Sequence, residues 1–87
     1  MACVYVLQSK KNGKFYVGST REENANIRLN AHNRGKTRST KVGRPWVLIY
    51  EEKYETYTEA RKREHFLKSG VGRQFFKQRL APERRGG

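Results

Sequence analysis

Two short runs of β-forming residues flank an Asn-Gly pair near the start of the chain, and this arrangement constrains the fold more than any other feature. Residues 3–7 and 15–18 are rich in Val and aromatic residues, and Asn12-Gly13 lies between them. Such residues favour strands, and Asn-Gly is a preferred pair for a tight hairpin turn. The chain is therefore predicted to begin with an antiparallel β-hairpin.

The register of this hairpin decides which tyrosines share a face of the sheet. If Asn12 and Gly13 are the two turn residues, Ser9 pairs with Tyr16. Side chains alternate between the two faces of a strand, so Tyr16 then faces the same side as Tyr5. A looser turn that shifts the pairing by two residues preserves this face and brings the tyrosines closer, whereas a shift of one residue separates their faces.

A capping pattern predicts a helix after the hairpin. Thr20 and Glu23 have the three-residue spacing of a capping box, and Gly35 is a typical helix end. Arg28 and His32 are four residues apart in this segment, so they lie together on one edge of the apolar helix face. The helix can thus bring a cation and an imidazole to the same place.

The second half of the chain predicts a third strand followed by two helices. Residues 46–50 form a continuous apolar run that is too short for a core helix, so we expect the central or most buried strand there. Thr58 can cap a helix over residues 59–69. Residues 75–80 indicate a short helix beyond it.

One carboxylate occupies the apolar side of the helix over residues 59–69. Glu64 falls on one helical line with Ala60 and Leu67. All 8 acidic residues of the chain are Glu, which shortens the search for a catalytic or metal-binding carboxylate. A carboxylate in this position is explained either by a buried ion pair with an arginine or by a role as metal ligand or general acid. The residues alone leave both explanations open.

The positive charge of the chain indicates its class of partner. Lys and Arg number 20 against 8 acidic residues, a formal net charge of +12, which attracts polyanions such as nucleic acid. Residues 34–44 contain cations and no acid, and we expect them to form a mobile basic loop that contacts phosphates. A merely solvated surface is the alternative for such a run. Its cations are Arg34, Lys36, Arg38, Lys41 and Arg44.

Residue usage excludes several kinds of protein and site. No apolar run approaches the roughly 20 residues of a membrane span, and the start lacks the basic segment of a secretory signal, so we expect a soluble, cytoplasmic protein. Cys3 is the single cysteine, so no intramolecular disulfide can form, and with two distant histidines no His/Cys metal cluster exists. A hydrolase built from this chain would use Tyr, Arg, His and Glu.

Tyrosine can act as a general base only if its proton is readily lost. Its reference pKa is about 10, which disfavours the phenolate at neutral pH. A strongly positive field, with Arg28 or a metal ion close by, favours the phenolate and makes such chemistry feasible.

The chemistry-bearing residues occur in the order and spacing of a known pattern. They are Val4-Tyr5, Tyr16-Val17-Gly18, Arg28, His32 and Glu64. This set resembles the GIY-YIG nuclease family, in particular the small stand-alone bacterial members related to the N-terminal nuclease domain of the excision-repair protein UvrC. The resemblance covers roughly residues 2–76. The chain reads Cys3-Val4-Tyr5 where the family's name has Gly-Ile-Tyr, and Val17 where it has Ile, but it keeps both tyrosines.

The resemblance implies a single α/β (α+β) domain with a central three-stranded antiparallel sheet flanked by helices. The strands and helices expected from the residues agree with this fold. We expect the domain to occupy residues 1–80 and residues 81–87 to be a disordered basic tail.

The resemblance also implies a role for each site residue. Tyr5 would take a proton from water, and Tyr16 would help position the water or the base. Glu64 would be the sole protein ligand of one Mg²⁺ or Mn²⁺ ion, whose other ligands are water and phosphate oxygens. Arg28 would stabilise charge on the phosphate, and His32 would orient Tyr5 or contact the phosphate.

The function that the resemblance implies is a metal-dependent endonuclease that cleaves phosphodiester bonds. DNA is the expected substrate before RNA, repair or recombination is the expected process, and no stable protein partner is expected. The alternative from another class is a catalytically idle module that binds nucleic acid through the same basic face. A structural partner in a repair or ribosomal complex is a third reading.

Overall fold

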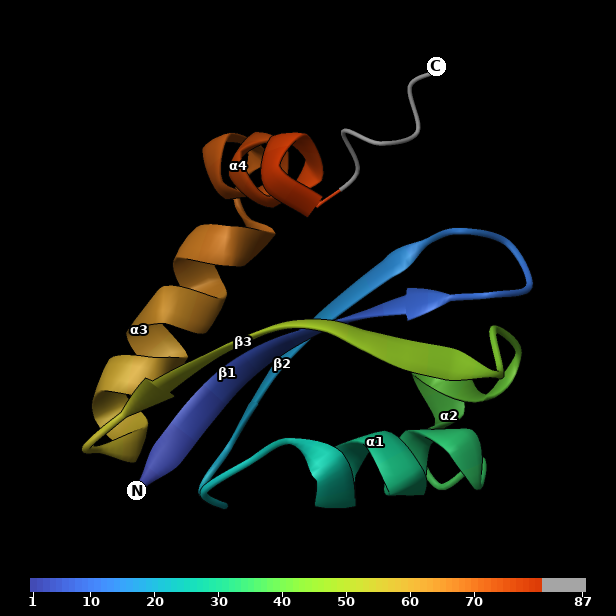
Figure 1. The fold of residues 1–87 in the computed structure, drawn as a ribbon, viewed down its shortest axis with the longest axis horizontal. Coiled ribbons are helices and arrows are strands. Elements are labelled where there is room, and N and C mark those ends of the chain that lie inside the picture. Colours follow the sequence, from blue (N-terminus) through green and yellow to red (C-terminus); the bar gives the residue numbers. More distant parts are fainter. Residues whose placement is uncertain (81–87) are drawn as a thin grey trace.

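The computed structural model describes residues 1–80, which form three strands and four helices (Figure 1). The strands are β1 (Ala2–Ser9), β2 (Phe15–Thr20) and β3 (Trp46–Tyr54). The helices are α1 (Asn26–Asn33), α2 (Arg38–Lys41), α3 (Tyr57–Lys68) and α4 (Gly70–Leu80). The basic tail predicted at residues 81–87 lies outside the described residues.

Strand β1 is the centre of the sheet, whose strand order is β2-β1-β3 with antiparallel pairing on both sides. The predicted three-stranded antiparallel sheet flanked by helices is therefore confirmed. Residues 2–7 of β1 are all buried. The prediction that residues 46–50 form the central or most buried strand is wrong, because β3 is an edge strand with mostly half-buried side chains. Leu48 packs against the cluster on one face of the sheet and Ile49 against the cluster on the other, so a continuous apolar run also suits an edge strand that has helices over both faces.

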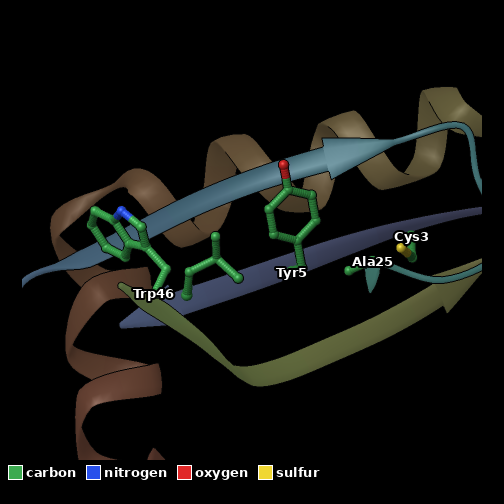
Figure 2. Close-up of a cluster of buried hydrophobic side chains, with 5 residues drawn as sticks. Cys3, Tyr5, Ala25 and Trp46 are labelled. Atoms are coloured by element: carbon green, nitrogen blue, oxygen red, sulfur yellow. The ribbon is translucent and has the colours of Figure 1, made fainter. Parts of the chain in front are cut away.

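Two apolar clusters fill the two sides of the sheet. Figure 1 shows α1 and α2 on one side and α3 with α4 on the other. On the α3 side, valines of β1 and β2 pack against Leu67. On the α1 side, Tyr5 and Trp46 belong to a second cluster (Figure 2). Alternate residues of β1 enter opposite clusters, which explains why both of its faces are apolar.

The hairpin adopts the looser of the two turns that the sequence allows. Leu7 pairs with Tyr16, so the register is shifted by two residues from the one in which Ser9 pairs with Tyr16. The Ser9 hydroxyl accepts hydrogen bonds from two backbone N–H groups of the loop, and Gly13 has a φ of 77°. Tyr5 and Tyr16 share a face, as predicted from the alternation of side chains, and their ring centroids are 6.5 Å apart.

Helix α1 begins later than the capping pattern predicts. Thr20 is the last residue of β2 and pairs with Cys3, so it cannot cap a helix, and the predicted capping box with Glu23 is wrong. The side chain at the N-cap, Ala25, makes no capping hydrogen bond. Instead the Glu51 carboxylate in β3 accepts a hydrogen bond of 2.7 Å from the Ala25 backbone N–H. A residue distant in the sequence thus supplies the anion at this helix start.

Helix α3 is capped by Thr56 rather than by the predicted Thr58. The Thr56 hydroxyl accepts a hydrogen bond from the Glu59 backbone, and the Glu59 carboxylate accepts one from the Thr56 backbone. Thr56 and Glu59 have the capping-box spacing, which Thr58 lacks. The prediction of a helix over residues 59–69 is confirmed apart from its ends, and α4 is longer than the short helix expected beyond it.

The basic segment at residues 34–44 contains a short helix, so the prediction of a loop is wrong for its central part. Thr40 in α2 is 1% exposed, and its carbonyl accepts a hydrogen bond of 2.7 Å from Trp46 Nε1. These contacts hold α2 against the start of β3. No helix within residues 1–80 is long and apolar enough to cross a membrane.

Candidate active site

An aromatic cluster on the α1 side of the sheet brings together three of the predicted site residues. Tyr5 comes from β1, Tyr16 from β2 and His32 from α1. The ring centroids of Tyr5 and Tyr16 are 6.5 Å apart, those of Tyr16 and His32 are 4.7 Å apart, and those of Tyr5 and His32 are 6.2 Å apart. Each ring therefore packs near both others.

Gly18 makes room for the Tyr5 hydroxyl. It pairs with Tyr5 across β1 and β2, and Figure 2 shows the Tyr5 ring extending from β1 toward β2. A Cβ atom at Gly18 would lie 2.6 Å from Tyr5 Oη, inside the optimal separation of non-bonded atoms. The glycine of the second motif thus permits a tyrosine hydroxyl to reach the edge strand.

A buried chain of polar atoms leads from Tyr5 to α2. Tyr5 Oη lies 3.3 Å from His32 Nε2, and His32 Nδ1 lies 2.7 Å from Thr40 Oγ1. Tyr5 is 1% exposed and His32 is 0% exposed. Sequence reasoning singled out the first two residues but missed Thr40, which lies in the segment that was expected to be a loop.

Burial decides the protonation of this pair. It raises the pKa of Tyr5 to about 12, and the neighbouring Arg28 guanidinium lowers that pKa only in part. Arg28 thus favours the phenolate, as expected, but loss of solvation disfavours the charged form more strongly, so the phenol keeps its proton at neutral pH. Burial also lowers the pKa of His32, and Arg28 adds to the effect. The imidazole is accordingly neutral at neutral pH.

Arg28 presents an unused hydrogen-bond donor at the site. Its Nε atom is buried and, among the atoms of residues 1–80, finds no hydrogen-bond partner. A buried donor without a partner costs about 1–3 kcal/mol, so such groups are seldom left unmet without a reason. A phosphate oxygen bound beside Tyr5 would supply the missing acceptor.

Glu64 lies on the apolar line of α3, as its spacing predicts. Its neighbours on that line, Ala60 and Leu67, are fully buried, and its own side chain is 12% exposed. Lys68 Nζ lies 2.8 Å from Glu64 Oε2, and Arg61 Nε lies 3.3 Å from Oε1. In this structure, the Glu64 carboxylate therefore forms the ion pair that was one of its two expected explanations.

The pKa of Glu64 is below its usual value. Burial raises that pKa, but hydrogen bonds from Lys68 and Ser19 and the charges of Lys68 and Arg61 outweigh the effect of burial. The carboxylate is therefore ionised at neutral pH, as a metal ligand must be.

Ser19 connects Glu64 to the edge strand that also borders Tyr5. Ser19 Oγ donates a hydrogen bond of 2.5 Å to Glu64 Oε1. Consecutive residues of a strand face opposite sides, so Gly18 meets Tyr5 on one face while Ser19 meets Glu64 on the other. The charge of Glu64 still acts on the Tyr5 hydroxyl and raises its pKa. Tyr5 and Glu64 thus reach β2 from opposite faces of the sheet.

The cations of the basic segment surround α2. Arg34, Lys36, Arg38 and Lys41 are exposed, whereas Arg44 is half-buried and donates a hydrogen bond of 2.8 Å to the Lys41 carbonyl. These cations lie in the same segment as Thr40. Because Thr40 contacts His32, the segment packs beside the aromatic cluster, although it contributes no ring to it. A cavity of about 280 Å³ lies between α2 and the hairpin and is lined by Tyr16, Thr40 and Trp46 among others.

The donor atoms around Glu64 can hold a hard divalent cation but offer few protein ligands. Within residues 1–80, no group of three or more His, Cys, Asp or Glu side chains could hold a metal ion. One carboxylate and the Ser19 hydroxyl supply oxygen atoms only, and Mg²⁺ is commonly bound by one or two carboxylates while it keeps several waters. An ion at Glu64 would take the place of a cationic side chain, since Lys68 contacts Oε2 and Arg61 contacts Oε1.

Comparison with known proteins identifies relatives along most of the chain. Residues 1–78 match the family described as the GIY-YIG catalytic domain. The UPF0213 protein of Staphylococcus aureus strain Mu3 is 43% identical over 67 residues, which cover 76% of this chain and 78% of that protein. UPF0213 proteins SA0446 of strain N315 and MW0443 of strain MW2 are similar to the same extent. No solved structure matches the chain significantly.

Proposed function

This chain belongs to the GIY-YIG family, and from that premise we propose that it is an endonuclease that hydrolyses phosphodiester bonds of nucleic acid with the help of one divalent metal ion. The family is one of nuclease domains, which makes nucleic acid the partner that membership indicates. One observation carries the proposal. The Tyr5 hydroxyl lies beside His32 and Arg28 and next to β2, and Glu64 contacts the same strand from the opposite face of the sheet.

Tyr5 accepts a proton from the attacking water in this proposal. Because its pKa is about 12, the phenol keeps its own proton until the water attacks. As the water oxygen bonds to phosphorus, a water proton passes to Tyr5 Oη, and the phenol proton passes to His32 Nε2, 3.3 Å away. The bond between phosphorus and the 3′ oxygen breaks, and that oxygen leaves with the electron pair and takes a proton from solvent. His32 then releases its extra proton to solvent, which restores the neutral imidazole.

Arg28 and Tyr16 bind and orient the reacting groups. Arg28 Nε, a buried donor without a partner in residues 1–80, is assigned to a phosphate oxygen, where it stabilises the negative charge that develops during attack. Tyr16 is assigned to the positioning of the water, since its ring packs against His32 and it lines the adjoining cavity.

Glu64 is the proposed protein ligand of Mg²⁺ or Mn²⁺, with Ser19 beside it. A bound ion of this kind stabilises the charge on the leaving oxygen. Glu64 is ionised and its carboxylate is held by Ser19 near β2, which supports this assignment. Both ions accept oxygen ligands, so either suits this donor set.

DNA is the substrate that we propose before RNA, with repair or recombination in the cytoplasm as the setting. The exposed cations of residues 34–44 would hold the phosphate backbone next to the aromatic cluster. A specific observation favours a second candidate, a catalytically idle module that binds nucleic acid: the carboxylate of Glu64 is already engaged by Lys68, Arg61 and Ser19.

Cleavage of labelled nucleic acids separates the two candidates. Single-stranded, duplex and branched DNA and RNA are incubated with the protein in Mg²⁺ or Mn²⁺, and the products are compared with those of Tyr5→Phe and Glu64→Gln. Both variants should bind as the wild type does. Tyr5→Phe should cleave about 10²- to 10⁴-fold more slowly, the range for loss of a general base, and Glu64→Gln, which weakens the proposed metal ligand, should lose metal-dependent cleavage. Glu55→Gln, a change in an exposed carboxylate, is the matched control and should cleave normally. Binding without cleavage on every substrate would favour the idle module.

A further inference from the structure

We propose that Thr40 is a positioning residue that determines which nitrogen of His32 carries the proton, and that it keeps Nε2 free to accept the proton of Tyr5. The effect on cleavage rests on the proposed function. The protonation pattern of the imidazole does not, and it can be measured in the protein without any substrate.

The contacts that carry this inference are short and buried. Thr40 Oγ1 lies 2.7 Å from His32 Nδ1, and His32 Nε2 lies 3.3 Å from Tyr5 Oη. Thr40 is 1% exposed and His32 is 0% exposed. In this setting the direction of each hydrogen bond depends on the protein groups themselves.

The number of available hydrogens determines which group donates in each of these hydrogen bonds. A neutral imidazole has one N–H group and one acceptor nitrogen, and a threonine hydroxyl has one hydrogen to donate. The Thr40 hydroxyl donates to the Thr37 carbonyl at 3.3 Å, one turn earlier. With its hydrogen used there, Thr40 Oγ1 accepts a hydrogen bond from His32 Nδ1–H. Nε2 is then the acceptor nitrogen, and the Tyr5 hydroxyl donates to it.

The opposite arrangement satisfies fewer groups. If Thr40 donated to Nδ1, the hydrogen would lie on Nε2 and would point at the Tyr5 oxygen, which already lies beside the Arg28 guanidinium. The Tyr5 hydrogen would then lose His32 as its acceptor. Buried donors without acceptors are disfavoured, so the first arrangement is the one that the surrounding groups support.

The position of Thr40 is itself held by the fold. The Trp46 indole N–H donates a hydrogen bond of 2.7 Å to the Thr40 carbonyl, and the Thr40 backbone N–H donates to the Thr37 carbonyl at 3.1 Å. These contacts hold α2 in the position that places the Thr40 hydroxyl against the His32 imidazole. A substitution at Thr40 should therefore alter the hydrogen bond between His32 and Tyr5.

Nitrogen NMR of the imidazole tests the proposal directly. The chain has two histidines, so the exposed His65 is changed to Gln and the ¹⁵N-labelled protein contains one imidazole signal pair. At a pH where His32 is neutral, we expect the hydrogen on Nδ1. Thr40→Val, which keeps the shape and removes the hydroxyl, should move the population toward the Nε2–H form, and Thr40→Ser should restore the original pattern. A hydrogen on Nε2 in the protein with Thr40 intact would overturn the proposal even if the Val variant failed to fold.

Cleavage rates supply the second readout. In nuclease assays at saturating substrate, Thr40→Val should be about 10- to 100-fold slower, by analogy with groups that orient a functional histidine, and Thr40→Ser should recover most of the rate. An unchanged rate together with a changed hydrogen position would contradict the proposed proton path and leave the assignment at Thr40 standing. An unchanged hydrogen position in Thr40→Val would overturn the assignment itself.

Discussion

Gly18 is the residue on which the position of the Tyr5 hydroxyl depends most directly. An alanine there would place its Cβ atom 2.6 Å from Tyr5 Oη, so the ring would have to move away from its place beside His32. Overpacking of this kind costs about 1–3 kcal/mol. We expect Gly18→Ala to lose most of its cleavage rate and to lower the free energy of unfolding, measured by initial rates and by urea unfolding.

Gly70→Ala is the control for this change, because within the described part of the chain a Cβ built at Gly70 has no atom within 4 Å apart from its chain neighbours and the backbone of its own helix. It should fold and cleave as the wild type does. Wild-type cleavage by Gly18→Ala, with its stability lowered, would show that the Tyr5 hydroxyl need not lie beside His32 for the reaction.

The positions of the predicted site residues follow local rules. Tyr5 and Tyr16 share a face in both of the registers that differ by two residues, so this prediction did not depend on which turn the hairpin adopts. His32 and Arg28 followed from helical spacing. Ser19 and Thr40 were not predictable in this way, because each meets its partner through the packing of separate elements. Ser19 and its acceptor are 45 residues apart in the sequence.

At the scale of elements, Glu52 joins the edge strand β3 to α3. Its carboxylate accepts hydrogen bonds from the hydroxyls of Tyr50 and Tyr54 and from Arg63 Nε, the last at 2.9 Å. Burial raises the pKa of Glu52, but the hydrogen bonds outweigh burial and leave the pKa below its ordinary value. The folded protein therefore holds this carboxylate in its ionised form more firmly than the unfolded chain does.

The stabilisation from Glu52 should disappear in acid. Because its pKa is lower in the folded state, the contribution is present above the ordinary carboxyl value of 4.5 and is lost as the pH falls through the folded-state value. We expect Glu52→Gln to lower the free energy of unfolding at pH 7 by about 1–3 kcal/mol and to make its decline in acid shallower. Urea unfolding between pH 7 and pH 3 measures both effects. Glu55→Gln should retain the wild-type decline, and a Glu52→Gln curve parallel to that of the wild type would contradict this role.

The ends and places of the elements were harder to predict than their types. The start of α3 was assigned to Thr58, although Thr56 has the better capping partner in Glu59. The start of α1 depends on Glu51, a residue of another strand, and no local pattern contains that information. The order of the strands likewise depends on which faces the helices cover, so an apolar run alone does not identify the central strand.

The whole molecule carries its positive charge on several elements. The net charge of +12 predicted a nucleic-acid partner, but charge acts over long distances and does not say where the partner lies. In the structure, a cavity of about 570 Å³ is lined by Lys11, Lys41 and Arg44 among others. Cations of the hairpin and of the basic segment therefore lie close together beside α2. This helix also carries Thr40, which contacts His32 of the aromatic cluster.

If nucleic acid lies across this basic segment, the salt dependence of binding should depend on which cations are removed and not only on how many. Each phosphate contact contributes roughly 0.9 to the slope of log affinity against log salt for duplex DNA, so Lys36→Ala with Arg38→Ala should flatten that slope by about 2. Lys53→Ala with Lys62→Ala removes the same charge from exposed positions in β3 and α3 and should change the slope little. Fluorescence anisotropy over a series of salt concentrations measures both variants. Equal slopes for the two pairs would mean that only the net charge matters, and the basic segment would then lose its place in the interface.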